Sequence, residues 1–195
     1  MIIQNQEAFF HFDLDGTLFD SMPTHIECYE KAFKELDIFW KDDYRITLKN
    51  GKNIDKILKL DSGVTSTDLC QLKEIKNRLF HNSIHQIKPN ITLLNFVKLV
   101  APNISLVTSA KKATVSEIFE YFKIINPFLI QITYESTSTH KPSPEPYEAA
   151  IVSARHSGIH VAVEDSIAGK KSAQAANMLV IDSLILTNSL KGCLK

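Results

Sequence analysis

The chain has 195 residues, of which 44% are hydrophobic and 23% are charged, and its 22 Lys and Arg balance its 22 Asp and Glu. This composition is typical of a globular protein, and a net charge of zero excludes a strongly basic surface for a nucleic acid or a membrane. No apolar run reaches the roughly 18 residues of a membrane span, and the N-terminus lacks the order of a signal peptide. We therefore expect a cytoplasmic protein, a monomer or weak homodimer, with no nucleic-acid or membrane partner.

The first predicted element is a short buried strand over residues 8–14, with the sequence AFFHFDL. Asp13 and Asp15 stand one residue apart at its end, directly after the apolar run. His11 interrupts that run, and we interpret it as a core or edge histidine whose ring is hydrogen-bonded. Two carboxylates at the end of a buried strand indicate a binding site at this end of the strand.

A helical segment is predicted to follow, between residues 22 and 90. Thr24 and Glu27 have the spacing of a capping box, which predicts a helix that begins at Thr24. Apolar residues at helical spacing predict two further helices, over residues 53–60 and 67–80. This part of the chain is therefore expected to be all-helical.

From residue 91 onward, predicted helices and strands alternate. The helices are expected over 91–100, 112–122, 144–156 and 166–176, and the strands over 103–110, 128–133, 159–163 and 178–182. Such alternation implies right-handed crossovers and a parallel sheet with helices on both faces. The first strand belongs to this set, so the sequence predicts a Rossmann-like α/β core, residues 1–21 and 92–195, with a small helical domain, residues 22–91, inserted in it.

Polar side chains follow four of the predicted strands. Strand by strand they are Asp13 and Asp15, then Thr108 and Ser109, then Lys141, then Glu164 and Asp165. Each of these residues is ordinary when taken alone, as a loop end, a strand-end hydroxyl, a surface lysine or a helix cap. Because ligands of open parallel sheets bind outside the carboxyl ends of the strands, we expect the whole series to meet in one crevice.

The chemistry of this series favours a metal ion and a phosphoryl group. Four carboxylates in one crevice repel one another unless a cation joins them, and oxygen ligands without His or Cys suit Mg²⁺. Of the pair Asp13 and Asp15, one carboxylate could act as a nucleophile and the other could transfer protons. Lys141 and a hydroxyl would compensate charge on the phosphoryl oxygens. Gly16 and Thr17 would turn the backbone sharply and offer N–H groups to the anion.

These stretches resemble the four motifs of the haloacid dehalogenase-like (HAD) superfamily of phosphohydrolases. FDLDGTLFDS is similar to its first motif, hhhDxDGT, and SLVTSA to its second. HKPSPEPY resembles the third motif in its KPxPxxY form, and VAVEDSIAGKKSAQAANM resembles the fourth in its EDSxxG form. Asn177 stands where a glycine is usual, and Asn tolerates the left-handed backbone at a helix end. The resemblance spans residues 9–178, and the helical insertion is similar to the family's C1 cap, which closes over the site.

The resemblance implies roles in catalysis for the motif residues. Asp13 would be the nucleophile that is phosphorylated, and Asp15 would be the general acid and base. Thr108 and Lys141 would hold the phosphoryl oxygens, with Ser109 next to them as a further substrate contact.

The resemblance also implies a Mg²⁺ site. Asp13 would bind the metal through its second carboxylate oxygen, and Asp15 would bind it through its backbone carbonyl. Asp165 would be a further ligand. Glu164 would be either another ligand or a residue that orients the others.

Within the family, DGTLFDSMPTH and KAFKELDI resemble β-phosphoglucomutases and phosphatases of sugar phosphates or phosphoglycolate. His25 is placed like a cap-hinge histidine of the mutases, but Ile54 lies near the position of their phosphate-gripping arginine. Lys49 or Lys52 would take a distal anionic group, unless both are solvated, and we include His25 and Lys52 among the candidate substrate-binding residues.

The function predicted from the sequence is that of a Mg²⁺-dependent phosphatase. It would act on a small phosphorylated metabolite such as a sugar phosphate or phosphoglycolate, through an aspartyl-phosphate on Asp13. A β-phosphoglucomutase-like isomerase is the alternative, and it would need a bisphosphate intermediate. A non-catalytic binding protein would be expected to lack the nucleophile or the metal-binding acids, and all of them are present here.

Overall fold

The computed structural model describes residues 8–51, 54–58 and 64–193. The chain forms two compact units, one of residues 1–19 and 89–195 and the other of residues 20–88. At the boundaries between them, the two-residue strands β2 (Phe19–Asp20) and β3 (Lys88–Pro89) pair in a small sheet. Neither strand was predicted, because two residues are too few to show an alternating pattern.

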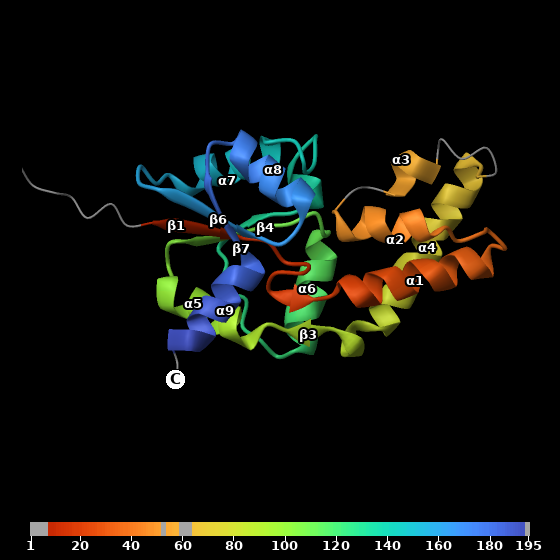
Figure 1. Ribbon diagram of the computed structural model, residues 1–195, viewed down its shortest axis with the longest axis horizontal. Helices are drawn as coiled ribbons and strands as arrows, with labels where there is room; N and C mark the ends of the chain where they lie inside the picture. The colour runs from red at the N-terminus through yellow and green to blue at the C-terminus, as the bar shows by residue number, and fades with distance from the viewer. Residues whose placement is uncertain (1–7, 52–53, 59–63, 194–195) are drawn as a thin grey trace, which may run out of the picture. The chain divides into compact units, whose positions relative to one another are not determined.

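The first unit is built on a parallel sheet of five strands in the order β5-β4-β1-β6-β7 (Figure 1). The strands are β1 (Phe9–Phe12), β4 (Ile104–Val107), β5 (Ile130–Ile132), β6 (His160–Glu164) and β7 (Leu179–Asp182). The central strand β1 pairs with β4 on one side and with β6 on the other. The predicted Rossmann-like α/β fold is therefore confirmed, and the strand order reverses at β1, where such sheets bind ligands.

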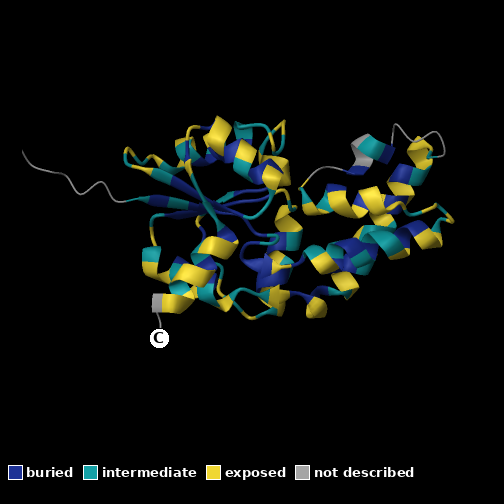
Figure 2. Cartoon of the chain, in the orientation of Figure 1, coloured by how far each residue is buried: buried dark blue, intermediate teal, exposed yellow. Residues whose placement is uncertain are grey.

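Helices cover both faces of this sheet (Figure 1). One face carries α7 (Glu145–Ala154) and α8 (Ile167–Ala175), and the other carries α5 (Ile91–Val100), α6 (Lys112–Tyr121) and α9 (Ser183–Cys193). The three central strands β4, β1 and β6 are largely buried, the edge strands β5 and β7 are partly exposed, and the outer faces of the helices are exposed (Figure 2). Asn177 ends α8 with a φ of 57°, the left-handed conformation predicted for it. Helix α9 was not predicted.

The second unit has a core of its own. Its helices are α1 (Met22–Glu35), α2 (Asp42–Lys49), α3 (Ile54–Leu58) and α4 (Ser66–Asn82). Buried side chains from all four helices form one cluster, which includes Phe33, Tyr44, Ile54, Leu58 and Leu72. Among the helices in the described part of the chain, none combines the length and the apolar character needed to cross a membrane.

The capping box predicted at Thr24 is wrong. Helix α1 begins at Met22 after Ser21, and Thr24 is a buried residue within its first turn. Pro23 explains the earlier start, because proline has the backbone angle of a first helical turn and lacks the N–H that such a turn leaves without a partner. A capping box does open α4, where the side chains of Thr65 and Asp68 each accept a hydrogen bond from the other residue's backbone N–H.

His11 is fully buried in β1 and hydrogen-bonded through both ring nitrogens, as predicted. His160 Nε2 lies 3.1 Å from the carbonyl of His156 and can only donate to it. When both rings are neutral, His160 Nδ1 accepts from His11 Nε2, 2.8 Å away, and His11 Nδ1 accepts from Ser105 Oγ at 2.7 Å. Burial, together with the charges of His160 and His156, lowers the pKa of His11 to about 3. Burial and the neighbouring histidines therefore favour a neutral His11.

We expect His11 to make the protein sensitive to acid. The unfolded chain binds a proton at His11 below its ordinary pKa of 6.5, whereas the folded protein resists that proton down to pH 3. The contribution of His11 to the free energy of unfolding is therefore complete above about pH 6.5 and falls as the pH drops, by about 2 kcal/mol at pH 5. Urea unfolding at pH 7.5 and pH 5 should show a smaller loss in His11→Gln than in the wild type. The exposed His85 provides the control, His85→Gln, and equal losses in all three proteins would contradict the prediction.

Candidate active site

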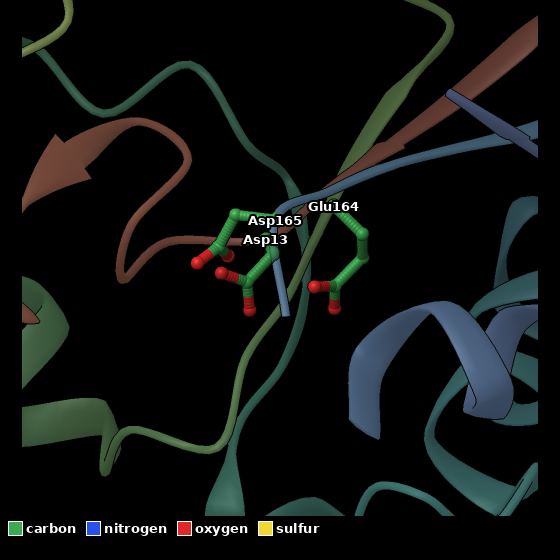
Figure 3. Close-up of side chains that lie close together, drawn as sticks. All are labelled: Asp13, Glu164 and Asp165. Carbon is green, nitrogen blue, oxygen red and sulfur yellow. The ribbon is translucent and has the colours of Figure 1, made fainter. Parts of the chain in front are cut away.

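Three acids meet at the carboxyl ends of β1 and β6. Asp13 directly follows β1, Glu164 is the last residue of β6, and Asp165 comes next. Their carboxylate oxygens lie within 4.8 Å of one another, and Figure 3 shows the side chains converging. Asp13 and Glu164 are buried, while Asp165 is partly exposed. Because both strands lie in the middle of the sheet, their ends hold these carboxylates in fixed positions.

Lys141 places a cation among these acids. Its Nζ donates to Asp13 Oδ1 at 2.7 Å, to Glu164 Oε1 at 2.5 Å and to the carbonyl oxygen of Val107 at 2.8 Å. The lysine side chain is only 6% exposed. Burial alone would lower the pKa of Lys141, but the charges of Asp13 and Glu164 outweigh burial and raise it. Lys141 is therefore a permanent cation that joins two strand ends, and the prediction that it reaches the acids is confirmed.

One lysine does not balance three carboxylates. Burial and the charge of Glu164 raise the pKa of Asp13 well above its ordinary value, although Lys141 opposes them. The same two causes, burial first, raise the pKa of Asp165 to about 6. The donor set consists of carboxylate oxygens alone, which are the ligands that hard divalent cations prefer. The site therefore fits a divalent cation, which would relieve this repulsion.

The turn after β1 needs glycine at position 16. Gly16 has a φ of +84°, and a Cβ atom on it would lie 2.2 Å from Asp165 Oδ2. The glycine thus permits both the turn and the close approach of Asp165. Thr17 Oγ1 donates to Asp165 Oδ1 at 3.2 Å and so helps to fix that carboxylate.

The expectation that Gly16 and Thr17 offer N–H groups to an anion does not agree with this structure. Gly16 N–H donates to the carbonyl of Phe19 at 2.7 Å, and Thr17 N–H is directed at the carbonyl of Leu14 at 3.4 Å. Both amides close the turn itself. The contribution of these two residues is to shape the loop and position Asp165.

The other predicted strand-end residues are Asp15, in the turn after β1, and Thr108 and Ser109, which follow β4. Asp15 lies in the turn, partly buried, and its charge contributes to the raised pKa of Asp13. Thr108 is buried directly after β4, where its Oγ1 accepts from the N–H of Ala110 at 3.0 Å, and the hydroxyl can still donate its own hydrogen. Ser109 is exposed. Thr108 and Ser109 stay predicted substrate contacts.

The structure describes only some of the residues that the sequence singled out in the helical unit. His25 lies in α1, where its ring stacks on Phe80 with centroids 4.1 Å apart and an interplanar angle of 5°. Lys52 falls outside the described residues. Ile54, which stands near the position of the arginine in the mutases, is buried in the core of the helical unit and presents no group to a ligand.

The helical unit contains a pocket of about 550 Å³ that sequence reasoning did not foresee. Arg45 and Lys49 of α2 line it opposite residues of α1 that include Ile26 and Glu30. Arg45 forms an ion pair with Glu30. The pocket thus offers cations, acids and an apolar wall, and its residue Lys49 is one that the sequence singled out as a candidate contact for an anionic group.

Two further residues that sequence reasoning left without a role contact Glu164. The hydroxyl of Tyr147 donates to Glu164 Oε1 at 2.8 Å, and Ser166 Oγ donates to Oε2 at 3.2 Å. Tyr147 lies in the first turn of α7, six residues after Lys141 in the KPSPEPY stretch. That stretch was the available signal, but the sequence alone does not show that both side chains turn toward one carboxylate.

Residues 11–182, nearly the whole chain, match the family model of the haloacid dehalogenase-like hydrolases. The chain belongs to this family. This HAD-like hydrolase is 24% identical over 192 residues to protein CbbY of Rhodobacter capsulatus, which covers 87% of this chain and 82% of CbbY. It is 26% identical over 140 residues to the pyrophosphatase PpaX of Oceanobacillus iheyensis, covering 72% of this chain and 65% of PpaX. The predicted family and the prediction of an enzyme are confirmed.

Solved structures show the same fold. A hydrolase from Pseudomonas syringae superimposes with a TM-score of 0.73 at 23% identity, over 89% of this chain and 82% of that one. CbbY from Rhodobacter sphaeroides, solved in complex with phosphate, gives a TM-score of 0.71 at 23% identity, over 89% and 84% of the two chains. This HAD-like hydrolase therefore shares the architecture of these proteins across most of its length.

Proposed function

We propose that this HAD-like hydrolase is a Mg²⁺-dependent phosphomonoesterase that works through an aspartyl-phosphate on Asp13. The observation that carries the proposal is the surroundings of the Asp13 carboxylate. Lys141 Nζ lies 2.7 Å from its Oδ1, and two more carboxylates lie within 4.8 Å, at the carboxyl ends of β1 and β6. A nucleophile, a fixed cation and a set of metal ligands are what phosphoryl transfer to a carboxylate needs.

Mg²⁺ would be held by Asp13, by Asp165 and by the backbone carbonyl of Asp15. When bound, it would neutralise charge that develops on the phosphoryl oxygens. The protein residues fit this role because their donors are all oxygen and because metal-free carboxylates at this spacing repel one another. Glu164 is the fourth acid of the site.

The residues of the chain account for both halves of the reaction. In the first half, a carboxylate oxygen of Asp13 bonds to phosphorus, the bond to the leaving oxygen breaks, and protonated Asp15 gives that oxygen its proton. In the second half, Asp15 takes a proton from water, and this water displaces Asp13 from phosphorus and releases inorganic phosphate. Lys141 and Thr108 would hold the phosphoryl oxygens throughout.

The substrate that we propose is a small phosphorylated metabolite, such as a sugar phosphate or phosphoglycolate. The proteins similar to this hydrolase support this class of substrate, because CbbY of Rhodobacter sphaeroides was solved with phosphate and, as a variant, with xylulose-1,5-bisphosphate. We propose that the helical unit is a cap that selects the leaving group, with His25, Lys49 and Lys52 as candidate contacts. Arg45 and Lys49 would suit a substrate with a second anionic group.

The test is release of inorganic phosphate across a panel of sugar phosphates, a sugar bisphosphate, phosphoglycolate and pyrophosphate. Each substrate is assayed with Mg²⁺ and with a chelator, and the Asp13→Asn protein serves as the blank. Release that needs both the metal and Asp13 supports the proposal and ranks the substrates. If no substrate releases phosphate, the phosphatase proposal fails, and conversion of a hexose 1-phosphate in the presence of a sugar bisphosphate would favour the mutase.

Asp15→Asn should separate the two halves of the reaction. A nitrophenolate leaves without a proton, so this variant should still allow one rapid release of p-nitrophenol per enzyme from p-nitrophenyl phosphate. Hydrolysis of the aspartyl-phosphate needs the base, so turnover should then fall by roughly 10²- to 10⁴-fold. With an alkyl phosphate the first half is also slow, and stopped-flow assays should show no burst. Bursts of equal size with p-nitrophenyl phosphate and with the alkyl phosphate, or a turnover equal to that of the wild type, would contradict the role of Asp15.

A further inference from the structure

Tyr147 is an unusual neighbour for a cluster of acids, because it is completely buried yet directs its hydroxyl into the site. It lies in the first turn of α7, with 0% of its surface exposed. The hydroxyl donates to Glu164 Oε1 at 2.8 Å, the same oxygen that accepts from Lys141 Nζ at 2.5 Å. Its ring centroid lies 5.2 Å from Lys141 Nζ, within the range of a cation–π contact. Tyr147 therefore contacts both members of the Lys141–Glu164 pair.

The side chain of Glu164 is buried, and both of its carboxylate oxygens accept hydrogen bonds. It is 0% exposed, and its other carboxylate oxygen accepts from Ser166 Oγ at 3.2 Å. A Cβ atom on Gly169 would lie 2.0 Å from this carboxylate, so the carboxylate rests on the backbone of α8. Three side-chain donors already occupy three of the roughly four acceptor sites of this group. Glu164 is thus built into the protein, whereas Asp165 is partly exposed.

Lys141 has three N–H bonds, and each has a partner. They point to Asp13 Oδ1, Glu164 Oε1 and the carbonyl oxygen of Val107. Of these partners, Asp13 is the one that would bond to phosphorus. If Glu164 and Val107 keep their two bonds, the third N–H of Lys141 is fixed in the direction of Asp13. A phosphoryl oxygen on Asp13 would then find that N–H already aimed at it.

We propose that Tyr147 is a positioning residue that holds Glu164, and that Glu164 orients Lys141 rather than binding the metal ion. The proposal rests on the proposed function, because it concerns how the lysine reaches the phosphoryl group. It also assigns Glu164 to the second of the two roles that the sequence left open. Without the tyrosine hydroxyl, Glu164 loses one of its three donors, and the lysine loses its fixed direction.

The test is Tyr147→Phe, which keeps the ring and removes the hydroxyl. Two affinities are measured by calorimetry, that for Mg²⁺ alone and that for inorganic phosphate in excess Mg²⁺, together with kcat/KM. Phosphate binding should weaken about tenfold and kcat/KM should fall about ten- to a hundredfold, as expected for a hydrogen bond to a charged group. The affinity for Mg²⁺ should change less than about twofold. Thermal unfolding checks that the variant is folded.

Glu164→Gln is the second variant, and it should show the same pattern of weakened phosphate binding with retained Mg²⁺ binding. Tyr44→Phe is the matched control, because Tyr44 is also buried, at 2% exposed, but lies in the core of the helical unit. It should change none of these quantities. Asp165→Asn shows what the loss of a metal ligand looks like in the same titration.

Two outcomes would overturn the positioning role. A Mg²⁺ affinity that falls in Glu164→Gln as far as it falls in Asp165→Asn would make Glu164 a ligand of the metal. Unchanged phosphate binding and unchanged kcat/KM in Tyr147→Phe would show that the hydroxyl positions nothing. In both cases the wild-type protein still binds and releases phosphate. If the wild type itself does neither, the proposed function fails, and the positioning role fails with it.

Discussion

Replacing Asp13 by Asn should reduce phosphate release by roughly a thousandfold or more while leaving the protein folded. An amide has no carboxylate oxygen to bond to phosphorus, so the first half of the reaction cannot begin. The shape of the side chain is kept, and its oxygen can still accept a hydrogen bond from Lys141, 2.7 Å away in the wild type. Phosphate release from the best substrate of the panel measures the effect, and circular dichroism checks the fold.

The matched control for this variant is Asp182→Asn. Asp182 also ends a strand of the same sheet, but it pairs with Lys170 at 2.5 Å, outside the group of three acids. This control should keep its turnover. Substantial turnover by Asp13→Asn would exclude Asp13 as the nucleophile, once mass spectrometry has shown that the asparagine has not reverted to aspartate by deamidation.

The acids of the site could be predicted from the sequence because of how parallel sheets are built. A buried strand such as residues 9–12 has an unmistakable apolar pattern, and whatever follows it must lie at the carboxyl edge of the sheet. Once β1 and β6 were predicted, Asp13 and Asp165 had to approach each other. The same logic placed Lys141 near the site, although its loop has no regular structure of its own.

The contacts within the site could not be predicted in the same way. The N–H groups of Gly16 and Thr17 were expected to face an anion, but they bond to carbonyl groups inside the turn. Tyr147 was overlooked because its direction depends on how the first turn of α7 packs on the sheet. Sequence position fixes which edge of a sheet a residue reaches, whereas side-chain direction depends on packing between elements distant in the chain.

The boundaries of elements show the same limit. Helix α2 was missed, since its eight residues, DDYRITLK, bury only Tyr44 and Thr47 and show no clear apolar stripe. Helix α1 was predicted two residues late because Thr24 and Glu27 have the spacing of a capping box, whereas Pro23 lies in the first turn of a helix that begins at Met22. Short elements carry few periods of a pattern, so local chemistry such as a proline decides where they begin.

The acidic site should also make the metal-free protein less stable than it would otherwise be. Three carboxylates lie within 4.8 Å, and burial followed by the charge of Glu164 raises the pKa of Asp165 to about 6. In the unfolded chain this carboxyl loses its proton near pH 3.8. The folded protein therefore has most of the stability from Asp165 at low pH and loses it as the pH rises through 6. At pH 7.5 the loss is about 1–3 kcal/mol, given that the side chain is partly exposed.

Asp165→Asn should accordingly stabilise the metal-free protein at pH 7.5 by about 1–3 kcal/mol while removing its response to Mg²⁺. The amide keeps an oxygen that can accept from Thr17, 3.2 Å from Asp165 Oδ1 in the wild type, and it brings no negative charge. Urea unfolding in chelator measures the gain, and the rise in Tm on adding Mg²⁺ that we expect of the wild type should be absent from the variant. Asp182→Asn should instead lose stability, because hydrogen bonds from Lys170 and two backbone N–H groups stabilise that charge, and it should keep the Mg²⁺ response. Lower stability of Asp165→Asn in chelator would show that this carboxylate is not under repulsion, and a retained response to Mg²⁺ would show that it is not a ligand. The expected result would mean that the protein retains a destabilising carboxylate because the metal ion requires it.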